Sequence, residues 1–141
     1  MTPLFTNEQI AQLIPQRPPI VMIDTVLRAD ENGICTALTV KEGNLFLWDS
    51  HLQEAGLVEH MAQTAAALAG VGNIISHAAP KVGFIGEVKD FTCFTLPKLG
   101  QTITTTLTTI ADLAGVRLVA CQTECNGQLV AQGQLKIVIQ D

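Results

Sequence analysis

The residues with the clearest capacity for acid–base chemistry form the string Glu-His-Met-Ala-Gln at positions 59–63. They lie in a stretch dense in alanine that predicts one long helix from about residue 54 to residue 70. In such an apolar helix, desolvation favours the neutral form of the Glu59 carboxyl group, which is the form a general acid needs. Gln63 follows one turn later on the same face and is expected to orient that carboxyl group through a hydrogen bond. The alternative is a solvated glutamate without a chemical role.

His51 is the candidate base, because it lies in the loop before this helix, eight residues ahead of Glu59. If the intervening chain were fully helical, the two Cα atoms would be about 12 Å apart. That separation is too large for both groups to act on adjacent atoms of one substrate unless the loop folds back. The alternative is an ordinary surface histidine. Asp49 is a second polar group of this loop, and His60 is expected to face the core or a dimer contact, because it projects about 100° away from Glu59.

Periodicity and turn signals outline the elements that must hold these groups. A short helix is expected at residues 7–14, and the long helix is expected to be closed by the glycines at 70 and 72. Hairpin signals lie at 30–33 and at Asn126-Gly127, whereas residues 42–53 lack periodicity and are expected to form a loop. Strands are expected at 20–27, 34–40, 82–94, 101–110, 116–124 and 128–139. Five to six antiparallel strands around one small-residue helix give an α+β fold.

Composition narrows the class of protein. The sequence has 141 residues, of which 48% are hydrophobic and 15% charged, so we expect a single domain over residues 1–141 with a substantial core. The net charge of −5 and the small number of aromatic residues argue against nucleic-acid binding. The longest apolar stretch, residues 57–71, is broken by polar residues, so no membrane span is expected. The first eight residues lack the features of a secretory signal, which makes the cytoplasm the expected compartment.

The cysteines give no sign of a metal site. They form no Cys-x-x-Cys pair and have no nearby histidine that would complete a zinc site. We therefore expect no metal and no cofactor, and buried free thiols at all four positions. These cysteines are Cys35, Cys93, Cys121 and Cys125.

Three strings, in order, resemble the 3-hydroxyacyl-[acyl-carrier-protein] dehydratases of the hotdog fold, in which a curled sheet wraps one central helix. Residues 14–24 are similar to the family's Leu-Pro-His-Arg opening, which precedes an apolar strand ending in Asp. Residues 59–63 resemble its Glu-x-Met-Ala-Gln string, whose glutamate is catalytic. Residues 83–91, followed by 97–101, are similar to a family strand and its Pro-Gly-Asp turn. The resemblance covers residues 13 to about 105, and the last two strands match in pattern only.

The resemblance implies loss of water from 3-hydroxyacyl thioesters on an acyl-carrier protein or coenzyme A, in fatty acid or polyene-type biosynthesis. Glu59 would be the general acid, with Gln63 beside it in the substrate site. The family's histidine and glutamate come from opposite subunits of a dimer, so His51 would act across the two-fold axis. Free backbone N–H groups at the helix start, around Gly56, would hold the thioester oxygen.

The same resemblance places an apolar tunnel for the acyl chain beside the helix. Its counterpart strand here carries Phe84 and Gly86, although Phe84 also fits an ordinary core position. An acidic carrier protein needs a local basic patch on a chain of charge −5. The basic residues considered for that patch are Arg17, Lys81, Lys89, Lys98 and Arg117.

Two departures from the family pattern separate this chain from the active dehydratases. The family's His-Phe-Pro-Gly turn lies about fourteen residues before the catalytic glutamate, where this chain has Leu45. The Pro-Gly that starts the family's helix is replaced by Glu54-Ala55-Gly56. This shortened helix start resembles a divergent dehydratase branch found in aryl polyene and related lipid clusters, whose members work as partners of a second hotdog subunit.

Three functions therefore compete. The first is a dehydratase of 3-hydroxyacyl thioesters, working as a homodimer or as a heterodimer with another hotdog subunit. The second is a non-catalytic hotdog subunit that has lost the base and pairs with an active dehydratase. The third is a hotdog acyl thioesterase, which uses a helix carboxylate and a water molecule and needs no histidine. The missing His-Phe-Pro-Gly turn favours the second and third, whereas residues 17–19 and 59–63 favour the first two.

Overall fold

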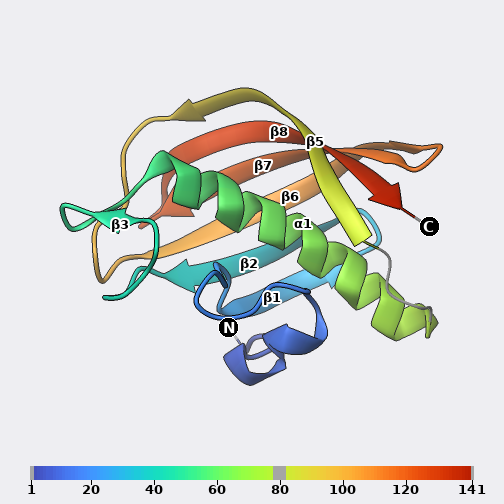
Figure 1. Ribbon diagram of the computed structural model, residues 1–141, viewed down its shortest axis with the longest axis horizontal. Coiled ribbons are helices and arrows are strands. Elements are labelled where there is room, and N and C mark those ends of the chain that lie inside the picture. Colours follow the sequence, from blue (N-terminus) through green and yellow to red (C-terminus); the bar gives the residue numbers. More distant parts are fainter. Residues whose placement is uncertain (1, 78–81, 141) are drawn as a thin grey trace.

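The computed structural model describes residues 2–77 and 82–140. Six strands form one antiparallel sheet in the order β1-β2-β6-β7-β8-β5, and the long helix α1 crosses one face of it (Figure 1). Two further short strands, β3 and β4, pair with each other beside the start of α1. The predicted α+β architecture is thereby confirmed. The elements are η1 (Asn7–Gln12), β1 (Thr25–Asp30), β2 (Gly33–Thr39), β3 (Leu47–Trp48), β4 (His51–Leu52), α1 (Glu54–Ser76), β5 (Val82–Cys93), β6 (Thr102–Leu113), β7 (Val116–Cys125) and β8 (Gln128–Gln140).

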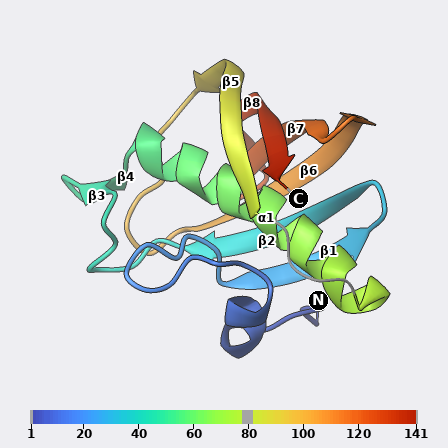
Figure 2. The same ribbon diagram turned by 45° about the vertical axis from the view of Figure 1, so that its right-hand side comes forward.

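The helix α1 forms because its alanines favour helical geometry and its larger side chains share one stripe. The members of that stripe are buried against the sheet: Leu57, Met61, Thr64 and Leu68. β5 curls over the second half of the helix (Figure 2), so that α1 lies between this edge strand and the rest of the sheet. Small residues on the remaining faces of α1 let neighbouring segments of the chain approach the helix closely.

The predicted helix end at the glycines is wrong, because α1 continues for 23 residues to Ser76. Gly70 serves close packing: a Cβ atom built there would lie 2.0 Å from the carbonyl oxygen of Leu13. The helix ends where His77 adopts a left-handed backbone with φ of 56°. Gly70 therefore marks a contact between the helix and the N-terminal segment, and it does not mark the end of the helix.

The first predicted strand is also displaced. The sequence predicts a strand over residues 20–27, yet β1 begins at Thr25. The backbone of residues 20–22 bonds to side chains of α1 instead of a neighbouring strand. The predicted helix at residues 7–14 is a shorter 3-10 helix, in which Gln9 accepts a hydrogen bond from the backbone N–H of Thr6.

The hairpin predictions are confirmed. Asp30 accepts hydrogen bonds from the backbone N–H groups of Asn32 and Gly33 in the turn between β1 and β2. Asn126 and Gly127 both have positive φ, 53° and 77°, as a two-residue turn between twisted strands requires. β6 and β7 extend to residues 113 and 116, so the predicted turn at 112–115 is reduced to its last two residues.

The outer edge of β5 is apolar and exposed. β5 pairs with β8 on one side, and no strand of the described ranges pairs with its other side. Phe84 is 50% exposed, Ile85 41% and Val88 40%, although all three are strand residues with large apolar side chains. An edge of this kind is suited to pairing with a strand of another subunit.

All four cysteines are free thiols, and three of them are buried as predicted. Cys93 is only half-buried, which corrects the prediction for that position. Burial raises the pKa of Cys121 to about 12, so that thiol remains protonated and unreactive at neutral pH. Within the described residues, no helix is long and apolar enough to cross a membrane.

Candidate active site

The carboxyl group of Glu59 is held by the side chain predicted to orient it. Glu59 is half-buried on α1, and the Nε2 atom of Gln63 donates to its Oε2 atom over 2.7 Å. The two residues lie four apart on one face of the helix, which brings their side chains together. Gln63 itself has no exposed surface, so its amide is fixed by the protein rather than by solvent.

The opposite side of Gln63 is bound to the segment before β1. Its Oε1 atom accepts a hydrogen bond from the backbone N–H of Met22, and its Nε2 atom donates to the carbonyl oxygen of Ile20 over 2.7 Å. The side chain of Gln63 therefore links Glu59 to residues 20–22, which we call the strap.

His60, the residue that follows Glu59 on α1, binds the same strap. Its Nδ1 atom lies 2.7 Å from the carbonyl oxygen of Met22, and because a carbonyl only accepts, Nδ1 carries the proton. Burial lowers the pKa of His60 to about 4, opposed by its bond to Met22 and by the carboxylate of Asp24. His60 is therefore a neutral core residue at physiological pH, which confirms the core alternative predicted from its position.

His51 lies at the β3–β4 hairpin, three residues before α1 begins. The turn residues Asp49 and Ser50 both have positive φ, 52° and 59°. This turn brings the carbonyl oxygen of Asp49 within 2.7 Å of Nδ1 of His51. Nδ1 must donate to that carbonyl, so neutral His51 presents the lone pair of Nε2, as a general base requires.

The structure does not bring His51 and Glu59 into one cavity. His51 lines a shallow cavity of about 320 Å³ together with Trp48, Gln53 and Lys98, and Glu59 is absent from its lining. Trp48 is 70% exposed there, although it is the largest side chain of the loop. The chain therefore presents the candidate acid and the candidate base at separate places.

The helix start differs from the prediction of free donors. The N–H groups of Gly56 and Leu57 both donate to the carbonyl oxygen of Gln53, at 2.9 and 3.2 Å, so neither is free for a thioester oxygen. Gly56 instead allows a close approach, since a Cβ atom there would lie 2.6 Å from Cβ of Phe46. Gly56 consequently has no free N–H group for the thioester oxygen, which its predicted substrate role requires.

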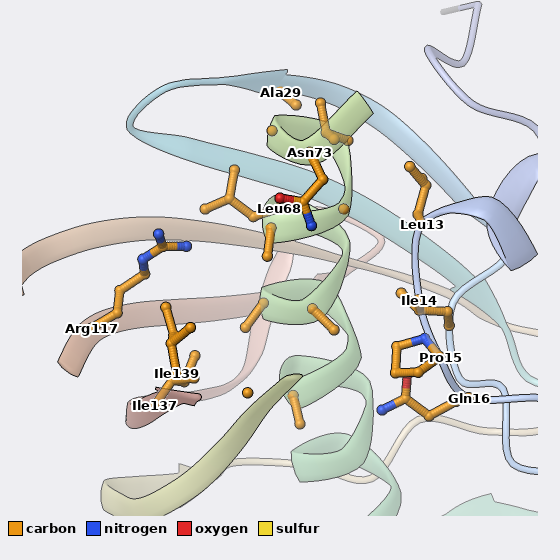
Figure 3. A pocket seen from close by; sticks show the side chains of 18 of the residues that line it. Leu13, Ile14, Pro15, Gln16, Ala29, Leu68, Asn73, Arg117, Ile137 and Ile139 are labelled. Atoms are coloured by element: carbon orange, nitrogen blue, oxygen red, sulfur yellow. The ribbon is translucent and has the colours of Figure 1, made fainter. Parts of the chain in front are cut away.

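A larger cavity of about 750 Å³ lies along the second half of α1 (Figure 3). The N-terminal segment, including Ile14 and Gln16, forms one side, and Ile137 and Ile139 of β8 lie on the other side of the helix. Five small residues of the helix line the cavity, Ala62, Ala65, Ala66, Ala69 and Gly70, together with larger ones such as Leu68 and Asn73. This cavity is mostly apolar, and the small side chains of α1 leave room for it.

The two substrate residues predicted on β5, Phe84 and Gly86, lie in different surroundings. Phe84 lines the larger cavity, whereas Gly86 is exposed on the strand and is absent from the lining. The predicted apolar tunnel beside the helix therefore has a counterpart to which Phe84 contributes. Gly86 lies against β8, where a Cβ atom would meet Cγ2 of Val138 at 3.3 Å.

The basic residues proposed for a carrier protein are only partly available. Arg17 donates to the backbone carbonyls of Ala11, Ile14 and Gln16, at the end of η1. Arg117 forms a 3.1 Å ion pair with Asp112. Lys81 lies outside the described residues, while Lys89 and Lys98 are exposed.

Sequence reasoning missed the role of the strap. The hydrogen bond of His60 to Met22 joins residues 38 apart, and neither spacing nor periodicity signals such a contact. The sequence signal in this region is the apolar run at 20–27, which predicts a strand. A buried backbone without a strand partner must find other partners, and α1 supplies them.

Comparison with known families and sequences identifies relatives. The family model ApeP-like, for the ApeP dehydratase, matches residues 8–141. A 3-hydroxyacyl-[acyl-carrier-protein] dehydratase FabZ of Staphylococcus aureus (strain JH9) is 33% identical over 72 residues, 47% of this chain and 49% of that protein. The chain thus spans about half the length of the curated relatives it matches.

Solved structures share the fold. The dehydratase heterocomplex ApeI:P from Xenorhabdus doucetiae aligns with a TM-score of 0.87 and 18% identity, over 100% of this chain and 93% of the other. A hypothetical thioesterase with coenzyme A from Streptococcus pneumoniae TIGR4 aligns with a TM-score of 0.66 and 10% identity, over 82% and 86%. At these identities the likeness establishes the hotdog fold.

Proposed function

The chain belongs to the ApeP-like dehydratase family, and we propose on this premise that it removes water from 3-hydroxyacyl thioesters carried by an acyl-carrier protein, in fatty acid or polyene-type biosynthesis. The observation that carries the proposal is the Glu59 carboxyl group held by Gln63 on the central helix, 2.7 Å from its amide nitrogen. The FabZ relatives, dehydratases of 3-hydroxyacyl chains on acyl-carrier protein, support this choice of substrate. The proposal also keeps the cytoplasm as the compartment.

The reaction needs two groups that move protons. A base removes the proton α to the thioester carbonyl, the double bond forms between the α and β carbons, and the C–O bond to the hydroxyl group breaks. An acid protonates the departing hydroxyl group, so that water leaves. Glu59 is the acid in this proposal. The acyl chain occupies the apolar cavity along α1, in contact with Phe84.

His51 is the proposed base, and it acts in a site completed by a second hotdog subunit. Its Nδ1 atom is tied to Asp49, which leaves the Nε2 lone pair for the proton of the substrate. Because His51 and Glu59 line no common cavity in one chain, each would work with a group from the partner. The solved ApeI:P structure is a heterocomplex of dehydratase subunits, which supports a heterodimer here.

The exposed edge of β5 is the proposed contact with that second subunit. Phe84, Ile85 and Val88 would be covered when the two edge strands pair and extend the sheet across both subunits. The exposed Lys98 lies in the cavity of His51 and is available to an acidic carrier protein.

A non-catalytic subunit is the second candidate. The separation of His51 from Glu59 favours it, because a chain could supply Glu59 alone and leave the base to its partner. In that case the activity would belong to the mixed pair and His51 would be dispensable.

One assay distinguishes these functions. The purified chain, alone and mixed with a second hotdog subunit of the kind found in ApeI:P, is incubated with 3-hydroxyacyl-carrier protein, and the intact mass of the carrier is followed. Loss of water with the chain alone supports a self-sufficient dehydratase, and loss of water only in the mixture supports a shared site. Loss of the whole acyl group would replace the proposal with a thioesterase. An unchanged carrier mass, both with the chain alone and with the mixed subunits, would contradict the dehydratase proposal.

A further inference from the structure

We propose that His60 is a positioning residue for Glu59, acting through the strap and Gln63, and that this arrangement leaves the proton of neutral Glu59 on its Oε1 atom. The inference rests on the proposed role of Glu59 as the acid. It adds a residue outside the reacting groups and specifies which carboxyl oxygen delivers the proton.

The first step is the orientation of the Gln63 amide, which is fixed by its two neighbours on the strap. The N–H of Met22 can only donate, so it must meet the oxygen Oε1. The carbonyl oxygen of Ile20 can only accept, so it must meet the nitrogen Nε2. A flipped amide would place two donors together and two acceptors together inside the core, where buried polar groups without partners are strongly unfavourable. The strap backbone therefore decides that Nε2 faces Glu59.

The second step concerns the proton of Glu59. An amide nitrogen carries two hydrogens and accepts none, and Nε2 of Gln63 uses them on Ile20 and on Oε2 of Glu59. Oε2 therefore accepts a hydrogen bond in either charge state of Glu59 and cannot direct a proton toward Gln63. When Glu59 is neutral, this contact favours the proton on Oε1, because an unprotonated carbonyl oxygen at Oε2 accepts more strongly than a hydroxyl oxygen would. That oxygen is the one available to a departing hydroxyl group.

The third step is the dependence of Gln63 on His60. His60 and Gln63 lie three residues apart on α1 and bind the C=O and the N–H of the same residue, Met22. His60 has no exposed surface and its Nδ1 atom is bound to Met22, so the ring has little freedom to move. Without His60, the carbonyl of Met22 would lose its partner, and the backbone on that side of the Met22 Cα atom would be held less firmly. The N–H that orients Gln63 belongs to the preceding peptide unit and is joined to the same Cα atom, so the hold of Met22 on Gln63 would loosen as well.

The test compares His60→Leu, which removes the donor, with His60→Asn, whose side-chain amide nitrogen occupies the place of Nδ1. Thr105→Val is the matched control, because it removes a buried 2.6 Å hydrogen bond to Thr123 between β6 and β7, away from the strap. Each full-length variant is assayed for kcat and KM with its hotdog partner. Hydrogen exchange of the Met22 amide is measured by NMR in the same variants.

We expect His60→Leu to lower kcat about tenfold or more, which is about 1.4 kcal/mol, with KM changed less than about threefold. Exchange of the Met22 amide should accelerate in His60→Leu beyond the effect of Thr105→Val. His60→Asn should restore both quantities. A folded His60→Leu variant that keeps the wild-type kcat and the wild-type protection of Met22 would overturn the proposal. A loss of kcat in Thr105→Val as large as that in His60→Leu would also overturn it.

Gln63→Glu keeps the inference testable if His60→Leu does not fold. This change keeps an oxygen for the N–H of Met22 but turns a second oxygen toward the carbonyl of Ile20 and Oε2 of Glu59, so kcat should fall. An unchanged kcat would contradict the proposal. A wild-type pair that dehydrates nothing would refute the proposed function, and fast Met22 exchange in the wild type would refute the strap mechanism by itself.

Discussion

The Nδ1 atom of His51 lies 2.7 Å from the carbonyl oxygen of Asp49, and this contact settles which nitrogen of the ring carries the proton. The contact depends on a two-residue turn in which both Asp49 and Ser50 have positive φ. Strained backbone of this kind is kept only where the surroundings determine it. The hairpin therefore holds the imidazole with its Nε2 atom available to a substrate.

His51→Gln tests the base. The amide of glutamine places a nitrogen or oxygen near the position of Nε2 without a basic lone pair, so kcat of the mixed pair should fall at least about 100-fold. His51 is half-buried in a loop, and stability should change by less than about 1 kcal/mol. Steady-state kinetics and thermal unfolding measure the two effects. Full activity of the mixed pair would exclude His51 as the base and support the non-catalytic subunit.

Stability should decline on the acid side because of His60. Its pKa of about 4 in the folded chain lies below the ordinary value of 6.5, so the unfolded chain binds more protons between these values. The free energy of unfolding should therefore fall as the pH decreases from about 6.5 to about 4, by up to about 3 kcal/mol. Urea unfolding of the wild type and of His60→Asn at several pH values measures this contribution. Parallel curves for the two proteins would show that His60 contributes nothing to the pH dependence.

Gly70→Ala should destabilise the chain, because its new Cβ atom would overlap the backbone of Leu13. Overpacking of this kind costs about 1–3 kcal/mol. Gly72→Ala is the control, since nothing lies within 4 Å of its Cβ position and alanine favours the helix by about 1 kcal/mol. Denaturant unfolding should thus give shifts of opposite sign. A stable Gly70→Ala variant would contradict the close approach of α1 and the N-terminal segment.

Ala66→Leu should shorten the acyl chain that the protein accepts. Ala66 lies on the helix wall of the 750 Å³ cavity, and three additional carbon atoms there would fill space that a long chain needs. We expect kcat/KM to fall for long 3-hydroxyacyl chains and to stay within about threefold for short ones. A uniform loss over all chain lengths would show that the cavity does not hold the acyl chain.

Val88→Lys should weaken the association with a second hotdog subunit. Val88 is 40% exposed on the unpaired edge of β5, where a charge would be buried by a partner strand. Leu4→Lys is the control, because Leu4 is 51% exposed beside β1 at the opposite edge of the sheet. Sedimentation equilibrium should show a loss of the pair for Val88→Lys only. Equal association of both variants would move the interface away from β5.

Features that depend on local sequence were predicted well. The hairpin at Asn126-Gly127 follows from the positive φ that its turn requires, and the contact of Glu59 with Gln63 follows from their spacing on a helix. In both cases the residues that decide the geometry lie within one turn of the chain.

Features that depend on distant segments were missed for a physical reason. The start of β1 at Thr25 and the hydrogen bond of His60 to Met22 both arise from the strap, whose partners lie about 40 residues later on α1. The continuation of α1 past Gly70 depends on Leu13, on another element. Periodicity reports which face of a segment is apolar, and it carries no information about which backbone group will meet that face.

Glu59→Gln in the mixed pair tests the central claim most directly. Glutamine keeps an oxygen for the Nε2 atom of Gln63 and the volume of the side chain, so the fold and the pairing should be preserved. It has no acidic proton to give to the hydroxyl group. The account predicts a loss of dehydration of at least about 100-fold, measured by the intact mass of the carrier protein, with an unchanged melting temperature. Dehydration at the wild-type rate would contradict it.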